Sequence, residues 1–480
     1  MINVLPTPKF YEFHSEDYHV LPMSLHTDVK EWSDIAEAFC DSFYKIYEQE
    51  LTITAPAGIL LVYDGEIAAN AYALDSTDRL IIRASAREGI CYGIATALQL
   101  MKVDGTELSV QSVCIKDHPD KDFRAFMIDV GFRWHPFDKM LKYVDLCFFY
   151  KINHLHLHIA DNNIYSLPSK AFPGLPTPRK HYTFEQIAQL NRYAEARGIK
   201  LVPEFECPGH AKAMNTAYPE IFMNRAETES GEFYNELGSK IDPLGLVCAG
   251  SERAFEGVKT ILAEIAELFP NAPYIHIGGD EAPHQMWEQC QECRAYMKAH
   301  GIKDSNELYS EFVGRVASYV LSLGKTPMVW EGFPKESAHY VPKETVVIAW
   351  ESHYQLATDL LENGFRIINA SWQPTYLVSS LDKRWGPKEL LDWNVYNWQH
   401  WWSSSAAYLS PINVQPTDRL LGATMCSWAL NYEQHIGRLL ENFPAFGQRT
   451  WQVERALDYE TYKQIFRTVL IKGAALIQDK

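Results

Sequence analysis

The chain has 480 residues, of which 47% are hydrophobic and 22% are charged, and its formal net charge is −17. This composition is typical of a folded protein that buries a large core and has room for two domains. Nucleic acids and anionic membranes bind surfaces with clustered Lys and Arg, so we expect neither as a partner of this acidic chain.

The first twenty residues, MINVLPTPKFYEFHSEDYHV, contain neither the basic start nor the apolar run of a secretion signal. We therefore expect a cytoplasmic location. The nine cysteines, an odd number, are scattered along the chain, which favours reduced thiols over a disulfide framework. Cys290 and Cys293 form one CxxC pair with no second pair near it in the sequence. We interpret them as ordinary helix residues and expect no metal.

Residues 1–118 combine strand-like segments, such as GILLVYDG and RLIIRAS, with the helical segment AREGICYGIATALQLM. This mixture predicts a small α+β domain. The charged, proline-containing stretch KDHPDKD at 116–122 marks a boundary, and no long flexible linker follows it. We therefore expect a second domain over residues 119–480 that packs closely against the first.

In the second domain, short apolar runs alternate with amphipathic stretches such as TFEQIAQLNRYAEARG and ERAFEGVKTILAEIAELF. Strands buried on both faces and separated by helices indicate a parallel sheet. Eight of them predict a closed (β/α)8 TIM barrel, followed by a last helix that closes it. The predicted strands are 125–130, 152–159, 199–205, 272–279, 325–330, 345–350, 365–370 and 420–428.

Polar and aromatic residues follow most of these strands, at the barrel end where catalytic groups of such enzymes meet. Examples are Asp161, Glu206, Trp330 and Trp350. Indole rings stack on the apolar faces of sugars, and carboxylates bind sugar hydroxyls. The pattern favours a carbohydrate site, although barrel ends also contain polar residues with structural roles.

The fourth predicted strand ends in YIHIGGDEAP, Tyr274 to Pro283. A Gly-Gly pair after an apolar run predicts a tight backbone turn. Two adjacent acids, Asp280 and Glu281, then follow at the catalytic end of the barrel. Neighbouring side chains in an extended segment point in different directions, so the two acids can contact different parts of one sugar.

HIGGDE, together with NHLHLH, VPEFECPGH and RAFMIDV, resembles glycoside hydrolase family 20, the β-N-acetylhexosaminidases. The resemblance covers essentially the whole chain. It implies a non-catalytic α+β domain before a catalytic barrel, and a retaining exo-β-N-acetylhexosaminidase that removes terminal β-linked GlcNAc or GalNAc. It also implies substrate-assisted catalysis, in which the 2-acetamido oxygen of the sugar attacks C1 and forms an oxazolinium intermediate.

The resemblance assigns the catalytic roles to three residues. Glu281 would protonate the leaving oxygen, and we expect its pKa to be raised by Asp280 and by partial burial. Asp280 would accept the acetamide N–H, and Tyr376 would bind the acetamide carbonyl oxygen. The expected substrate is a small oligosaccharide or glycoconjugate, with no cofactor.

Other roles follow from the same resemblance. The residues expected to bind substrate are Arg124, Trp330, Trp350 and Trp428. The residues expected to hold the two acids in place by hydrogen bonds are Asp161, Glu206, His210 and His276.

The chain departs from the family pattern at Val378 and Leu430, where the family has acids that bind the outer hydroxyls of the sugar. We hypothesise that this apolar pair makes room for a substituent at O4 or O6. GlcNAc and GalNAc differ only at O4, so the sequence leaves the choice between them open.

Two alternatives remain at this stage. His154, His156 and His158 alternate along one strand face and resemble the metal ligands of barrel amidohydrolases. The chain could also be a sugar-binding relative without turnover. Finally, the aromatic segment 382–408 contains five tryptophans, which suit either the leaving-group side of the cleft or a homodimer contact.

Overall fold

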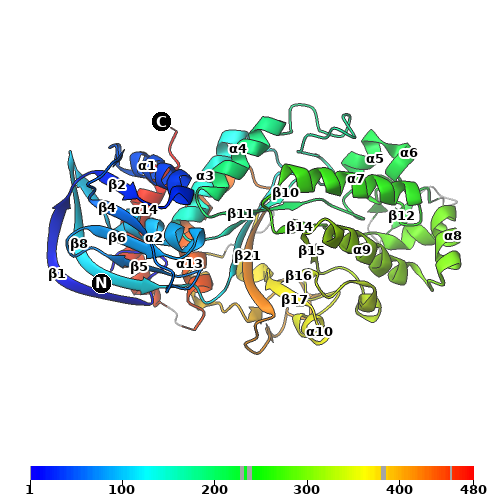
Figure 1. Ribbon diagram of the computed structural model, residues 1–480. Helices are drawn as coiled ribbons and strands as arrows, with labels where there is room; N and C mark the ends of the chain where they lie inside the picture. Colours follow the sequence, from blue (N-terminus) through cyan, green and yellow to red (C-terminus); the bar gives the residue numbers. More distant parts are fainter. Residues whose placement is uncertain (1, 227–231, 235–239, 380–384, 455–456, 480) are drawn as a thin grey trace.

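The computed structural model describes residues 2–226, 232–234, 240–379, 385–454 and 457–479, and it contains two domains side by side (Figure 1). The N-terminal domain mixes a sheet with helices, and the second is a parallel barrel surrounded by helices. The fold predicted from the sequence is therefore confirmed. In the part of the chain that the structure describes, no helix has the length and apolarity needed to cross a membrane.

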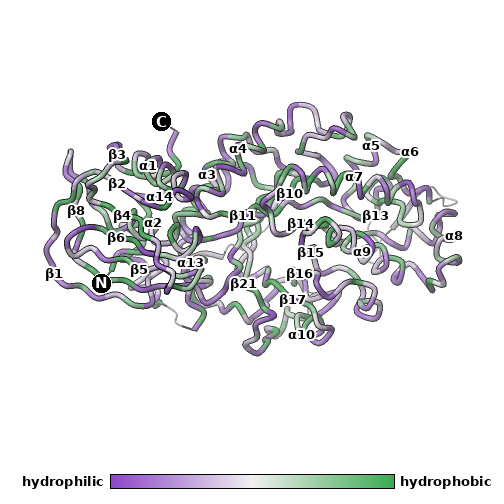
Figure 2. Tube along the Cα trace, in the orientation of Figure 1, coloured by the Kyte–Doolittle hydropathy of each residue, from purple (hydrophilic) through white to green (hydrophobic). Residues whose placement is uncertain are grey.

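The sheet of the N-terminal domain has the strand order β1-β8-β5-β6-β4-β2-β3, and β7 pairs with β8. Its outer strand β1 alternates exposed and half-buried residues, and Figure 2 draws it largely in the hydrophilic colour. The strands are β1 (Phe10–Leu21), β2 (Ser24–Thr27), β3 (Thr52–Ile53), β4 (Ile59–Tyr63), β5 (Tyr72–Asp75), β6 (Leu80–Ala84), β7 (Lys102–Asp104) and β8 (Glu107–Asp117).

Two helices of this domain, α1 (Ser33–Tyr47) and α2 (Arg87–Leu100), pack beside the sheet. The last helix of the chain, α14 (Tyr459–Leu476), contacts α1 as well as α3 and α13 of the barrel. Its Lys472 donates hydrogen bonds to carbonyls at the end of α2, among them those of Gln99 and Met101 at 2.6 Å. The expected last helix is therefore present against the barrel, and it also joins the two domains.

The barrel contains eight parallel strands in the order β9-β10-β11-β14-β15-β16-β17-β21, and the pairing of β21 with β9 closes it. A short strand, β18 (Tyr376–Val378), adds to β21 at the catalytic end. The barrel strands are β9 (Phe123–Asp129), β10 (His154–His158), β11 (Lys200–Glu204), β14 (Tyr274–His276), β15 (Thr326–Trp330), β16 (Val346–Ala349), β17 (Arg366–Asn369) and β21 (Leu420–Trp428).

Helices cover the outside of the barrel, and further short elements extend its catalytic end. The helices are α3 (Phe137–Phe149), α4 (Phe184–Glu195), α7 (Glu252–Leu268), α8 (Gln291–His300), α9 (Ser305–Ser322), α10 (Ala357–Glu362), α12 (Pro387–Asp392) and α13 (Tyr432–Trp451). The short elements include α5 (Lys212–Ala217), α6 (Pro219–Phe222), η3 (His284–Gln289), α11 (Trp372–Thr375), β12 (Phe233–Tyr234), β13 (Lys240–Ile241), β19 (Asn397–Trp398) and β20 (Ile412–Asn413).

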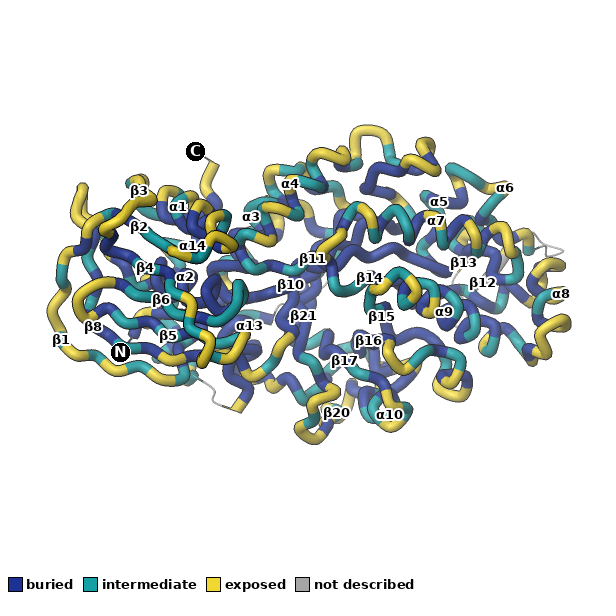
Figure 3. The backbone as a smooth tube through the Cα atoms, in the orientation of Figure 1, coloured by how far each residue is buried: buried dark blue, intermediate teal, exposed yellow. Residues whose placement is uncertain are grey.

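The barrel strands form the most buried part of the molecule (Figure 3). Side chains such as Ala125, Met127 and Ile348 fill the barrel interior, while Phe126 and Ile128 of the same strand β9 pack outward against the helices. Each fully buried Met, Ile or Phe side chain of this kind contributes roughly 1.5–3 kcal/mol. A packed interior fixes the strand ends, and therefore the loops that follow them.

Candidate active site

A pocket of about 210 Å³ opens at the carboxyl ends of the barrel strands. Ligand sites for drug-sized molecules usually measure about 300–1,000 Å³, so this pocket suits a smaller ligand such as one sugar ring. The lining residues come from several strand ends and their loops, and they are His158, Asp161, His210, Asp280, Glu281, Trp330, Trp350, Trp372, Tyr376, Val378 and Trp428.

The Gly-Gly pair of HIGGDE turns the chain into this pocket. Gly278 and Gly279 have φ angles of 70° and 89°, values that residues with a Cβ rarely adopt. A Cβ on Gly278 would lie 2.0 Å from Glu206 Oε2, and one on Gly279 would lie 2.4 Å from Val329 Cγ2. Both glycines are therefore needed, and the acids that follow them emerge at the pocket.

Asp280 is buried, and its Oδ1 atom has no hydrogen-bond partner among the described residues. Burial raises the pKa of Asp280 to about 7, and the nearby charges of Glu281 and Glu204 act in the same direction. A buried carboxyl oxygen without a partner loses the free energy of its hydration. It is therefore ready to bind an N–H group of a ligand.

Glu281 is the more accessible acid, with 54% of its side chain exposed. Its Oε2 lies 3.5 Å from Nε2 of His210, whose Nδ1 lies 3.3 Å from Oδ1 of Asp161. Asp161 and Glu281 raise the pKa of His210 well above its usual value, and the hydrogen bond from His210 lowers the pKa of Glu281. The expectation of a raised Glu281 pKa is wrong, because it overlooked this imidazolium.

Glu281 also has a φ of 47°, and His210 has a φ of 49°. Left-handed backbone at residues other than glycine costs of order 1–3 kcal/mol and is concentrated at functional sites. The surrounding structure must compensate for this cost at two residues that contact each other. This observation supports a functional interpretation of the Glu281–His210 pair.

Behind the pocket, Glu204 at the end of β11 binds several groups of the barrel interior. It accepts hydrogen bonds from the Trp330 indole and from Nδ1 of His158, the latter at 2.7 Å. Nδ1 of His276 lies 3.0 Å from the same carboxylate. The histidines around it hold the pKa of Glu204 well below its usual value. Sequence reasoning missed this role, since only the neighbouring Glu206 matched the family pattern.

Glu206 and His276, expected near the acids, lie behind the pocket and do not line it. Burial raises the pKa of Glu206 well above its usual value, and Asp280 and Glu204 add to this effect. His276 is fully buried, and its Nδ1 accepts a hydrogen bond from the Gly278 amide at 3.0 Å. The two residues thus contact the Gly-Gly turn, while Asp161 and His210 contact the ligand space directly.

Three tryptophans predicted from the sequence, Trp330, Trp350 and Trp428, line the pocket. The Trp330 ring centroid lies 6.1 Å from that of Trp350 and 6.0 Å from that of Trp428. Trp372 also lines the pocket. It was not among the predicted substrate-binding residues, and only its position after the seventh strand pointed to it. Its ring stacks on Tyr376 with centroids 4.2 Å apart, so indole or phenol rings surround the ligand space.

Tyr376 completes this wall with a polar atom. The residue is 1% exposed, and its hydroxyl is buried without a hydrogen-bond partner among the described residues. Burial raises the pKa of Tyr376 well above its usual value, so the hydroxyl keeps its proton. It is a donor available to a ligand oxygen.

Two buried carboxylates hold the loops around the pocket. Glu331 accepts hydrogen bonds from five backbone amides between Trp350 and Gln355, at 3.0–3.3 Å. Asp129 accepts from the amides of Phe132 at 2.7 Å and Ala429 at 2.9 Å. Asp129 ends β9 and Glu331 directly follows β15, and the structure identifies the amides that they bind.

Arg124 does not bind the ligand space, so this prediction is corrected. The guanidinium is fully buried and donates to the Tyr92 hydroxyl at 2.7 Å and to the Lys151 carbonyl at 2.8 Å. Arg124 stands near the start of β9, five residues before Asp129, whereas the pocket lies at the other end of the strand. Its role is to join the barrel to α2 of the N-terminal domain.

The two apolar residues that replace family acids, Val378 and Leu430, lie in different surroundings in the structure. Val378 lines the pocket, whereas Leu430 is buried in the hydrophobic core, and its carbonyl oxygen lies 3.0 Å from Nε2 of His135. Only Val378 can contact a sugar substituent in the observed pocket.

The aromatic segment 382–408 lies partly outside the described residues, which resume at 385. Trp385, Trp393 and Trp398 are buried within the chain, so they are not available for a homodimer contact. Trp401 lies against Trp372, with ring centroids 5.9 Å apart. That tryptophan extends the aromatic wall of the pocket.

The three histidines of β10 contact different groups. His154 stacks on Phe123 at 4.2 Å, while Nε2 of His156 lies 3.0 Å from Glu204 Oε2. His158 alone reaches the pocket. They do not converge as one ligand set, in contrast to the amidohydrolase alternative.

Comparisons with known proteins agree with this geometry. Residues 122–453 match the family described as "Glycosyl hydrolase family 20, catalytic domain", and residues 1–118 match "Glycosyl hydrolase family 20, domain 2". The chain is 31% identical over 377 residues to a β-hexosaminidase of Vibrio furnissii, covering 72% of this chain and 59% of that protein. It is also 31% identical over 319 residues to a β-hexosaminidase of Akkermansia muciniphila, covering 62% of each chain. The chain thus spans about 60% of the length of these relatives.

Among solved structures, the fold resembles an exo-β-N-acetylglucosaminidase of Vibrio harveyi in complex with N-acetylglucosamine. The TM-score is 0.84 at 22% identity, with 100% of this chain and 78% of that chain covered. A β-N-acetylhexosaminidase of Bacteroides fragilis gives a TM-score of 0.79 at 21% identity, with 96% and 93% covered. At these identities, the likeness concerns the fold.

Proposed function

The chain belongs to glycoside hydrolase family 20, and from this membership we propose that it is a retaining exo-β-N-acetylhexosaminidase. It would remove terminal β-linked N-acetylglucosamine or N-acetylgalactosamine from a small oligosaccharide or glycoconjugate. Family membership contradicts the metal-dependent amidohydrolase alternative. The non-catalytic sugar-binding alternative is an outcome of the test below.

One observation supports this proposal above the others. The same pocket is lined by Asp280, whose Oδ1 lacks a partner among the described residues, and by Tyr376, whose hydroxyl also lacks one there. Buried polar groups are almost always satisfied, and a ligand that supplies one donor and one acceptor would satisfy both atoms at once. An acetamido group supplies an N–H for the carboxyl oxygen and a carbonyl oxygen for the hydroxyl.

In the proposed reaction, the acetamide carbonyl oxygen attacks C1 while the glycosidic C–O bond breaks. Glu281 donates its proton to the leaving oxygen, and Asp280 stabilises the positive charge that develops on the acetamide. In the second step, the Glu281 carboxylate accepts a proton from water, whose oxygen attacks C1 and opens the oxazolinium ring. Two inversions at C1 give net retention.

Substrate binding must move a proton for this reaction to begin. In the structure, the Asp280 pKa of about 7 and the lowered Glu281 pKa favour a proton on Asp280. An acetamide N–H bound to Asp280 would favour its ionised form, and a sugar that covers Glu281 would favour its protonated form. The substrate therefore helps to place the acid proton.

The decisive experiment compares wild type with Glu281→Gln on aryl β-N-acetylglucosaminides whose leaving groups differ in acidity. With a poorly acidic leaving group, loss of the general acid should lower kcat/KM, which reports the first step, by about 10²–10⁴-fold. With a strongly acidic phenol, which needs no proton, the first step should be far less affected. The galactosaminide series run in parallel would identify the preferred sugar.

A uniform loss of kcat/KM across the leaving-group series would contradict the general-acid role of Glu281. If wild type turned over no substrate but bound N-acetylglucosamine in calorimetry, the binding-protein alternative would replace the enzyme. The Val378 hypothesis is tested with O6-substituted glycosides, and a preference for the unsubstituted sugar would refute it. The homodimer stays a prediction for solution scattering.

A further inference from the structure

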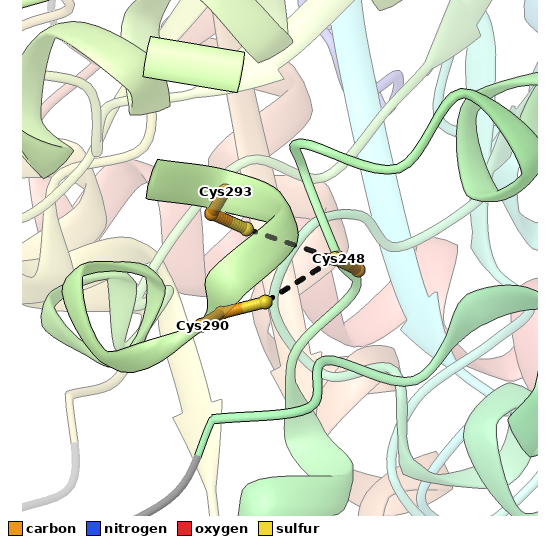
Figure 4. Close-up of side chains that lie close together, drawn as sticks. All are labelled: Cys248, Cys290 and Cys293. Carbon is orange, nitrogen blue, oxygen red and sulfur yellow. Dashed lines mark hydrogen bonds between the residues drawn. The ribbon is translucent and has the colours of Figure 1, made fainter. Parts of the chain in front are cut away.

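Three cysteines come together where the start of α8 meets the segment before α7 (Figure 4). Cys290 and Cys293 are the CxxC pair at the start of α8, and Cys248 comes from the segment before α7. The Cys248 sulfur lies 3.8 Å from that of Cys290 and 3.6 Å from that of Cys293. All three side chains are buried. The expectation that the CxxC pair consists of ordinary helix residues overlooked this third thiol, 42 residues upstream of Cys290.

We propose that Cys248, Cys290 and Cys293 form a structural zinc site. In a tetrahedral zinc–thiolate centre with Zn–S distances of about 2.3 Å, the sulfur atoms are about 3.8 Å apart. The observed separations of 3.8 and 3.6 Å match that value, whereas a disulfide would require about 2.05 Å. A disulfide joins only two cysteines, so it would leave the third thiol of this cluster without a partner, whereas a zinc ion can bind all three.

The surroundings of the sulfurs fit thiolate ligands. The backbone amides of Cys293 and Arg225 face the Cys290 sulfur, and the Gly250 amide faces that of Cys293. The Asn224 side chain donates to the Cys293 sulfur at 3.6 Å. Donors of this kind orient metal ligands and stabilise their negative charge.

A described candidate for the fourth ligand is Glu292. Its Oε2 lies 3.5 Å from the Cys248 sulfur, and the residue itself is exposed. A carboxylate on the solvent side of three buried thiolates gives a closed, four-coordinate site. Binding of the ion would release the three thiol protons to solvent.

The proposed ion would join two segments that also hold the active site. Cys290 directly follows η3, nine positions after Glu281 in the sequence. Cys248 follows Val247, whose amide donates to the Pro208 carbonyl at 2.9 Å, two residues before His210. A Cβ on Gly250 would lie 2.5 Å from Cys293 Cα, so glycine permits this close approach. The site would thus fix the loops of Glu281 and His210 relative to each other.

The test is elemental analysis of protein purified from zinc-supplemented culture without chelator or affinity metal. We expect about one zinc per chain in wild type, and background zinc in Cys248→Ser and Cys293→Ser. Cys114→Ser, which changes a half-buried thiol in β8 of the other domain, should keep the full amount. These readouts do not depend on glycosidase activity, so they stand apart from the proposed function.

A second set of measurements does not depend on the serine variants, which could fail to fold. Modification of the thiols with a mercurial in the presence of a zinc-sensitive dye should release one equivalent of zinc. Replacement by cobalt should give the thiolate charge-transfer and visible bands of a tetrahedral site, and Glu292→Gln should weaken cobalt binding at least about tenfold. Zinc-free protein without a cobalt spectrum, or a disulfide between any two of the three cysteines, would overturn the proposal, and unchanged cobalt affinity in Glu292→Gln would overturn the carboxylate ligand.

Discussion

Asp280 and Asp161 line the same pocket, but their pKa values are shifted in opposite directions. Burial raises the pKa of Asp280 to about 7, so the stability associated with its proton is present below pH 4 and is lost as the pH rises through 7. The imidazolium groups of His158 and His210 hold the pKa of Asp161 well below its usual value. The stability from Asp161 is therefore present above about pH 4 and lost at lower pH.

This opposition predicts opposite effects of two amide variants. Relative to wild type, Asp280→Asn should gain unfolding free energy between pH 4 and 8, by up to about 4 kcal/mol, while losing hydrolytic activity. Asp161→Asn should be less stable than wild type at pH 7, with the difference shrinking below pH 4. Urea unfolding of the three proteins across this pH range provides the measurement. A pH-independent gap for Asp280→Asn would show that its charge state does not limit stability.

Tyr376 gives a prediction that concerns the ligand and not the fold. Its hydroxyl has no partner among the described residues, so Tyr376→Phe should leave the free energy of unfolding within about 1 kcal/mol of wild type. If the hydroxyl binds the acetamide oxygen, kcat should fall by about 10²–10³-fold, as for removal of an oxyanion donor. The measurements are denaturant unfolding and steady-state kinetics. Unchanged kcat in a stable variant would remove Tyr376 from the reaction.

At the scale of elements, the Gly-Gly turn after β14 determines where the acids lie. Gly278→Ala combines a φ of 70° with a Cβ placed 2.0 Å from Glu206 Oε2. We expect loss of at least about 2 kcal/mol of stability and a large fall in kcat, because Glu206 and the following acids must move. Gly324→Ala is the matched control, since its φ is 73° and nothing lies within 4 Å of the added Cβ.

The control variant should lose only the backbone cost of about 1–2 kcal/mol, with normal kcat. Thermal unfolding and steady-state kinetics of both variants provide the comparison. Equal kinetic effects in the two variants would contradict the argument that the turn places the acids. The prediction concerns this turn alone, because Gly324 lies between α9 and β15, away from the lining of the pocket.

The elements were predictable where the sequence pattern is local. Every predicted barrel strand is present, because an apolar run between amphipathic helices has few other solutions. Arg124 was assigned to the wrong end of its strand by resemblance alone. Strand alternation could have corrected it, since Arg124 and Asp129 are five positions apart and therefore point to opposite faces. Cys248 had no local signal, because only the fold brings it to the CxxC pair.

At the scale of the whole molecule, a buried polar network joins the two domains. Lys151, in the barrel domain, donates to Asp117 Oδ2 at 3.2 Å and to the Tyr72 hydroxyl at 2.9 Å, both in the N-terminal domain. Trp451 of α13 donates its indole N–H to Asp117 Oδ1 at 3.0 Å. Neither charged side chain of the Lys151–Asp117 pair is exposed. No local pattern predicts such a junction, because its members come from distant parts of the chain.

This junction predicts that the domains unfold together. Lys151→Met should cost roughly 3–5 kcal/mol, because it leaves the Asp117 carboxylate buried without its cation. Adding Asp117→Asn should recover part of that loss, since the amide has no charge to compensate. The exposed pair Lys388–Asp392, with side chains 60% and 66% exposed, is the control, and breaking it should cost less than about 1 kcal/mol.

The same network predicts the number of transitions in calorimetric unfolding. If Lys151 and Asp117 couple the domains, wild type should unfold in one calorimetric transition, and Lys151→Met should separate it into two or lower it as a whole. The double variant tests the electrostatic cause, because a merely steric effect of the methionine side chain would not be relieved by Asp117→Asn. Two independent transitions in wild type would contradict the coupling. The alternative outcome is a single transition in wild type, lowered by Lys151→Met and partly restored in the double variant. It would mean that the N-terminal domain stabilises the barrel through one buried ion pair. Because this pair lies at the opposite end of the strands from the catalytic pocket, the pocket would be stabilised from a distance.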